Sequence, residues 1–95
     1  MPAYIVSDLT IKDAEAIKEY RTRAAASIAR HGGRYLVRGG AVESLEGGWT
    51  PEAIVVVEFD TAEQARAWYA SPEYARALEV RQIALARRLI LVEGV

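Results

Sequence analysis

The chain has 95 residues, a net charge of −1 and no cysteine, and 52% of its residues are hydrophobic. The near-neutral charge argues against a nucleic-acid or anionic-membrane partner, and the lack of cysteine excludes disulfides and thiolate nucleophiles. The length predicts one domain, residues 1–95. No apolar run approaches the ~20 residues of a bilayer-spanning helix. The chain begins with strand-like residues rather than a signal sequence, so we expect a cytoplasmic protein.

The first predicted strand covers Ala3–Leu9, because its residues are mostly apolar and β-favouring. A helix is expected next, running to about Arg30 or His31, with either Thr10 or Asp13 as its cap. At ~100° per residue one stripe of this helix faces the core. The members of that stripe are Ile17, Tyr20, Ala24, Ile28 and His31.

Gly32 is expected to end this helix in the left-handed conformation, which glycine adopts without a Cβ clash. A second strand is predicted from Tyr35 to about Leu45, with a bend at Gly39-Gly40, since glycines inside a strand often mark bulges or bends. Residues Glu46–Pro51 form a predicted loop. Ala53–Phe59 is the clearest strand in the sequence.

The next helix has two candidate capping boxes, Asp60 with Glu63 or Thr61 with Gln64. After Trp68 the pattern restarts, with Ser71 as N-cap and Pro72 at the first helical position. This second helical segment is predicted to run to about Ala86. The last strand is expected over Arg88–Glu93.

The predicted order β-α-β-β-α-β is that of the α+β ferredoxin-like fold, a four-stranded antiparallel sheet with two helices on one face. Several strands are apolar at successive positions, so apolar residues point to both faces of the sheet. The helices cover only one face, and a large exposed apolar face is unusual for a monomer. We therefore expect a homodimer formed through the open sheet face.

Several short segments resemble one known family. The segments are Tyr35-Leu36-Val37-Arg38-Gly39-Gly40, Glu46-Gly47 before Trp49 and Pro51, Glu58-Phe59, Trp68, Ser71 with Glu73-Tyr74, and Leu91-Val92-Glu93-Gly94. Together they resemble the bacterial domain-of-unknown-function family 1330, in the dimeric α/β-barrel superfamily, over nearly the whole chain. The resemblance implies a ferredoxin-like dimer with sheets paired face to face, and it implies no particular reaction. Relatives in the superfamily include cofactor-free monooxygenases, isomerases, haem enzymes and stress proteins. The chain departs from the family pattern at Ala53, where an arginine is expected.

No motif for a metal, a phosphate or a Ser-His-Asp triad is present, so no metal or other cofactor is expected. His31 is the only histidine, and it is either a base or haem ligand or a residue favoured at a helix C-terminus. Tyr20 and Tyr74 lie on inward helix stripes, where phenols either line a cavity or belong to the core. The candidate ligand-binding residues are Tyr20, His31, Arg38, Glu58, Trp68, Ser71, Tyr74 and Arg81.

Arg81 lies at the centre of an apolar stripe on the last predicted helix, from Tyr74 to Leu85. A guanidinium between helices and sheet needs an acceptor. The acceptor is either a protein carboxylate such as Glu58, or a carboxylate or enolate ligand.

Three functions remain open from the sequence. The first is a homodimer that binds a small organic acid or apolar metabolite between helices and sheet. The second is a cofactor-independent enzyme of the isomerase or monooxygenase type that uses the same cavity, and the third is a structural or stress-protective dimer.

Overall fold

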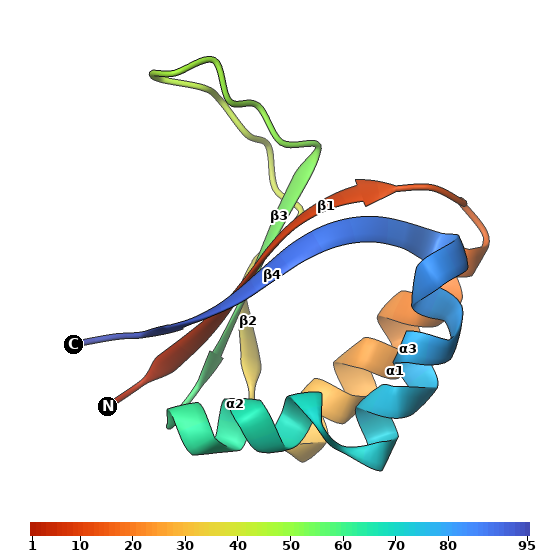
Figure 1. Cartoon of the computed structure of the whole chain (residues 1–95), viewed down its shortest axis with the longest axis vertical. Helices are drawn as coiled ribbons and strands as arrows, with labels where there is room; N and C mark the ends of the chain where they lie inside the picture. Colours follow the sequence, from red (N-terminus) through yellow and green to blue (C-terminus); the bar gives the residue numbers. More distant parts are fainter.

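The computed structural model describes all residues from 1 to 95 (Figure 1). Four strands and three helices follow one another along the chain. They are β1 (Ala3–Ile11), α1 (Ala16–Arg30), β2 (Arg34–Arg38), β3 (Ala53–Phe59), α2 (Ala62–Tyr69), α3 (Pro72–Ala84) and β4 (Leu85–Glu93). None of the helices has the length and apolar composition needed to cross a lipid bilayer.

The strands form one antiparallel sheet in the order β2-β3-β1-β4. This is the predicted ferredoxin-like arrangement, and the prediction of the fold class is confirmed. The helices lie together on one side of the strongly twisted sheet (Figure 1). Helix α1 packs mainly against α3 and stands off from the sheet, so side chains rather than backbone contacts bridge the space between α1 and the sheet.

Local hydrogen bonds explain where the helices begin. The carboxylate of Asp13 accepts hydrogen bonds from the backbone N–H groups of Glu15 and Ala16, at 2.9 and 2.8 Å. Thr61 caps α2 by accepting from the N–H of Gln64 at 3.1 Å. The structure thus selects Asp13 and Thr61 from the predicted alternatives, because their side-chain oxygens meet unpaired N–H groups of the first turn.

Two further predictions about helix ends are confirmed. Ser71 caps α3 by accepting from the N–H of Tyr74 at 3.1 Å, and Pro72 is its first residue. Gly32 has a φ of +76° just after α1 ends. A Cβ in that conformation clashes with its own backbone, which is why a glycine stands there.

The second strand is shorter than predicted, since it ends at Arg38 rather than near Leu45. Gly39 has a φ of +72°, outside the β region, and this turns the chain away from β3. Residues 39–52 then form a loop that projects beyond the sheet (Figure 1). We call this loop the arm. Its Trp49 side chain is 59% exposed.

The boundary between α3 and β4 also differs from the prediction. The helix ends at Ala84 rather than Ala86, and the strand begins at Leu85 rather than Arg88. Leu85 has φ −160° and ψ 162°, which is extended backbone. The inward positions of β4 therefore follow a period of two from Leu85, through Arg87, to Leu89.

The two faces of the sheet have different surroundings. The inner face meets the helices in a core whose strand residues include Ile5, Val57 and Phe59. The outer face has no helix over it, and its apolar residues are half-buried or exposed. They are Val6, Ile54, Val56, Ile90 and Val92.

Candidate functional site

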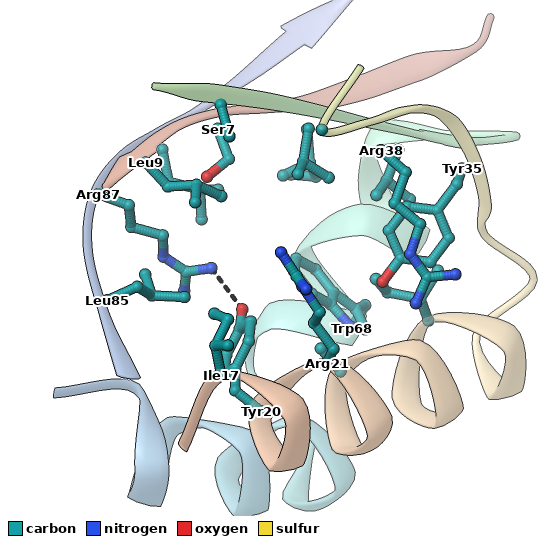
Figure 2. Close-up of a pocket in the computed structure, with 18 residues that line it drawn as sticks. Ser7, Leu9, Ile17, Tyr20, Arg21, Tyr35, Arg38, Trp68, Leu85 and Arg87 are labelled. Carbon is teal, nitrogen blue, oxygen red and sulfur yellow. Dashed lines mark hydrogen bonds between the residues drawn. The ribbon is translucent and has the colours of Figure 1, made fainter. Parts of the chain in front are cut away.

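A cavity lies between α1 and the inner face of the sheet (Figure 2). The space open to the centre of a water-sized sphere is about 70 Å³, and one water needs about 10–15 Å³ of such space. Its walls are mostly apolar or aromatic, with Ile5, Ile17 and Leu89 among them. This room exceeds that of a single bound water, and the apolar lining suits the body of a small organic molecule.

Arg87 enters this cavity from β4 and joins two tyrosines. Its Nη1 donates to the hydroxyl of Tyr20 at 2.6 Å (Figure 2), and its Nη2 donates to the hydroxyl of Tyr74. The two phenol oxygens also lie 2.7 Å apart and share a hydrogen bond. The site therefore contains one partly buried cation held by two neutral hydroxyl groups from α1 and α3.

No carboxylate balances Arg87. Its guanidinium takes part in no salt bridge, and the cavity lining contains three arginines (Arg21, Arg38 and Arg87) and no aspartate or glutamate. Burial raises the pKa of the Tyr74 phenol above its ordinary value, Tyr20 raises it further, and the charge of Arg87 opposes the rise. Tyr74 therefore stays protonated at neutral pH and acts as a hydrogen-bond donor or acceptor rather than an anion.

Burial alone would lower the pKa of Arg87. The electrostatic and hydrogen-bonding effects of Tyr20 and Tyr74 outweigh burial, so that the pKa of the guanidinium lies above its usual value. The Arg87 guanidinium is thus positively charged at neutral pH.

Ser7 adds a polar group to the same cavity. It is only 4% exposed, and its hydroxyl oxygen has no hydrogen-bond partner. Its register partner on β4 is Leu89, which is two residues from Arg87, so both polar side chains belong to the inner face of the sheet. Figure 2 shows the Ser7 hydroxyl pointing into the cavity. A buried polar group normally has a partner, and a ligand oxygen would supply one.

Trp68 forms part of the wall opposite the sheet and is fixed by its own hydrogen bond. Its indole N–H donates to the hydroxyl of Ser27 at 2.9 Å, and that hydroxyl donates to the carbonyl of Ala24 at 2.7 Å. The Trp68 ring also lies 4.2 Å from the ring of Tyr74, centroid to centroid. These contacts hold a flat aromatic surface in one orientation beside the cavity.

A β-bulge in β2 brings Arg38 to the cavity mouth. Tyr35 pairs with Val57 and Arg38 pairs with Val55, with one extra residue between them, Leu36. Because Val55 and Val57 both face inward, the bulge places Tyr35 and Arg38 on the inner face although they are three residues apart. The guanidinium of Arg38 lies over the Tyr35 ring, 4.3 Å from its centroid.

Three of the eight candidate residues line the cavity, namely Tyr20, Arg38 and Trp68. Tyr74 belongs to the same group through its hydrogen bonds with Tyr20 and Arg87. Each of these four comes from a different element of the fold, namely α1, β2, α2 and α3.

Three other candidates lie outside the cavity lining. His31 has its Nδ1 3.0 Å from the carbonyl of Ser27 and its Nε2 3.7 Å from Glu73. Ser71 uses its hydroxyl as the cap of α3. Glu58 is on the outer face of the sheet and forms a salt bridge with Arg34.

Arg81 does not line the cavity, and the ion pair considered between Arg81 and Glu58 is absent. Helix α3 packs mainly against α1, and the guanidinium of Arg81 forms no salt bridge. The inward arginine is Arg87, which lies outside the predicted last strand because the predicted helix extends beyond Ala84. A period of two from Leu85 to Leu91 was the signal that would have found it.

The sequence profile of the domain of unknown function DUF1330 matches residues 2–95, and the chain belongs to that family. No curated protein matches the chain.

Solved structures with this fold include proteins of known and unknown function. RPA0582 of Rhodopseudomonas palustris, of unknown function, is 20% identical with a TM-score of 0.79, and the match covers 99% of this chain and 82% of that one. SnoaB of Streptomyces nogalater, a cofactor-independent oxygenase, is 17% identical with a TM-score of 0.71, covering 98% and 92%. A dimeric ferredoxin-like protein of unknown function from Thermobifida fusca is 21% identical with a TM-score of 0.63, covering 96% and 89%. At these identities the likeness shows the fold alone.

Proposed function

We propose that this protein binds a small organic acid with an apolar body in the cavity between α1 and the sheet. The observation that carries the proposal is Arg87, a partly buried guanidinium whose only acceptors are the phenols of Tyr20 and Tyr74. Taking a charge out of water is unfavourable unless an opposite charge compensates. An anionic ligand supplies the charge that the chain itself does not place there.

The rest of the cavity fits the two parts of such a ligand. The apolar walls and the flat face of Trp68 suit a hydrocarbon or aromatic body. The guanidinium of Arg87 matches the planar geometry of a carboxylate or enolate. The unpartnered hydroxyl of Ser7 offers a further hydrogen bond to a ligand oxygen.

The proposed working form is a homodimer that joins the outer faces of two sheets. Ile90 on this face is 57% exposed and Val92 is 43% exposed. Val6 lies beside Ile90 on the next strand, and Val56 lies beside Val6. A contiguous apolar patch of this kind is typical of a protein–protein interface. The similar protein from Thermobifida fusca is dimeric, which supports the proposal.

A cofactor-independent enzyme of the oxygenase or isomerase type is the second candidate function. It is favoured by the guanidinium and two phenols at one point of the cavity, since such donors stabilise an enolate formed from a bound acid or ketone. SnoaB, which has the same fold, is a cofactor-independent oxygenase. The protonated state of Tyr74 weighs against this tyrosine as the base, so a substrate in this site would have to ionise readily.

Calorimetry with benzoate and its neutral analogue benzamide tests the binding proposal. The two probes have nearly the same shape and differ in charge, so we expect benzoate to bind and benzamide to bind at least tenfold more weakly, because charge-assisted hydrogen bonds are the stronger ones. Equal affinity for both probes would contradict an anion site. Oxygen uptake with readily ionised phenolic ketones then separates the oxygenase from a protein that only binds.

A further inference from the structure

The cavity has positive groups at two places rather than one. Arg87 lies on β4, at one edge of the sheet, and Arg38 lies on β2, at the other edge. Both side chains line the same cavity and neither forms a salt bridge in the structure. Figure 2 shows the two guanidinium groups on opposite sides of the cavity, with Trp68 between them in the view.

The register of the sheet fixes how far apart the two edges are. Arg38, Val55, Ser7 and Leu89 form one row across the four strands. Neighbouring strands lie ~4.8 Å apart, so the backbones of β2 and β4 are about 14 Å apart along this row. Arg87 is two residues from Leu89 on β4, and both arginine side chains rise from the inner face into the same cavity, so one small molecule there lies between two positive groups.

The cavity surface between the two arginines is mostly apolar. Val55 and Leu89 give the row an apolar floor, and Trp68 gives an apolar surface on the helix side. The Ser7 hydroxyl is the one polar group in the floor and has no partner. Arg21 of α1 adds a third positive charge to the lining, and Figure 2 shows it reaching toward the cavity.

We infer that the site takes a dianion, a dicarboxylate with a short apolar spacer, one acid group on Arg87 and the other on Arg38. This inference rests on the proposed function and names its ligand class. A monoanion neutralises one of three arginines and leaves the others without a counter-ion, whereas a dianion neutralises both edges. The bulge at Leu36 supports the assignment, because it turns Arg38 onto the inner face, and bulges commonly re-aim a side chain at a functional site.

The test measures binding of straight-chain dicarboxylates from succinate to suberate by calorimetry at neutral pH. Each dicarboxylate is compared with the monocarboxylate of equal carbon number, from butyrate to octanoate. We expect an optimum chain length at which the diacid binds about tenfold or more tightly than the monoacid, the effect of one added charge-assisted hydrogen-bonded pair. In Arg38→Met this ratio falls close to one.

Arg34→Met is the matched control, because Arg34 is on the same strand but pairs with Glu58 on the outer face. It should retain the full preference for diacids. If wild-type protein binds monoacids as tightly as diacids, or if the preference survives in Arg38→Met, the inference is wrong while the proposed function stands. If neither series binds, the proposed function fails as well. Arg38 is exposed, so circular dichroism of Arg38→Met should match that of the wild type.

Discussion

Arg87 and Arg88 are neighbours on β4 and have opposite surroundings. Arg88 points to the outer face of the sheet, where its register partner Asp8 accepts a hydrogen bond from it at 2.5 Å. Arg87 points to the inner face, where its register partner is Leu9 and its acceptors are two phenols. One step along the strand thus separates a cation with a counter-ion from a cation without one.

The same contrast holds for β2. Arg34 faces outward and pairs with Glu58, whereas Arg38 faces the cavity and lies over an aromatic ring. The chain supplies carboxylates to the arginines of the outer face and none to those of the cavity. Buried charges are ordinarily paired, so the partly buried Arg87 of the cavity is better explained by an anion that comes from outside.

The largest effect is expected for Arg87→Met. Removal of this guanidinium should weaken benzoate binding by more than ~100-fold, since it removes the charge that compensates the buried acid group. The fold should be retained, because the hydroxyls of Tyr20 and Tyr74 still bond each other. Calorimetry gives the affinity and thermal melting gives the stability. Unchanged affinity would show that Arg87 is structural and does not bind the anion. Arg87 and Arg88 would then not differ in function.

A charge on the outer face should break the proposed dimer. Ile90→Glu places a carboxylate in the apolar patch, and burying it unpaired is unfavourable, so the dissociation constant should rise at least tenfold. Light scattering over a concentration series measures this. Ala86→Glu, also outward on β4 but near its start, is the control. A wild-type protein that is monomeric at tens of micromolar would contradict the dimer itself.

The hydroxyl of Tyr74 beside the cavity should make the stability of the protein depend on alkaline pH. The raised pKa of Tyr74 means that its neutral form is favoured in the folded state. Its contribution to stability is therefore complete below about pH 10 and is lost as pH rises above that value. Tyr74→Phe should cost about 1–2 kcal/mol at neutral pH and should lose less stability than wild type between pH 9 and 11.

Denaturant melts across this range measure the difference. The pKa of Tyr4 is also raised, by its hydrogen bond with Glu58, and that of Tyr35 by its burial. Both tyrosines are present in both proteins, so their effects cancel. Parallel curves for the two proteins would show that the Tyr74 hydroxyl titrates as it does in the unfolded chain.

The smallest effect is expected for Arg88→Met. Its side chain is mostly exposed, and exposed ion pairs contribute about 0–1 kcal/mol. The free energy of unfolding should change by less than ~1 kcal/mol, and benzoate affinity should not change. A loss of benzoate binding comparable to that of Arg87→Met would mean that the net charge of β4, rather than the inner site, attracts the anion.

The order and type of the elements could be predicted from the sequence because their signals are local. Ser71-Pro72 at the start of α3 and the continuous run Ala53–Phe59 of β3 depend on a few adjacent residues. The length of β2 could not be predicted, because residues after Gly39 are extended or not according to whether β3 runs beside them. That pairing is a tertiary contact, and the residues near Leu45 do not indicate whether it forms.

The site was harder to predict because it depends on the exact residue at which α3 ends and β4 begins. If the helix continues past Ala84, the helical period of 3.6 residues turns Arg81 inward; if the strand begins at Leu85, its period of two turns Arg87 inward. Leu85 is an inward residue in both patterns, so the sequence does not show where the change occurs. Arg38 was named from the family resemblance alone. Its inward direction depends on the extra residue at Leu36, and a bulge becomes visible only when the partner strand is in place.

The burial of Trp68 gives the protein an optical probe of its own. This indole is 2% exposed and forms part of the cavity wall, whereas Trp49 on the arm is 59% exposed. Tryptophan emission shifts to longer wavelength in water, so the two residues contribute bands of different colour. A ligand that enters the cavity changes the shorter-wavelength emission of Trp68. Iodide in solution quenches the longer-wavelength emission of Trp49. Occupancy of the cavity is therefore measurable without an attached dye.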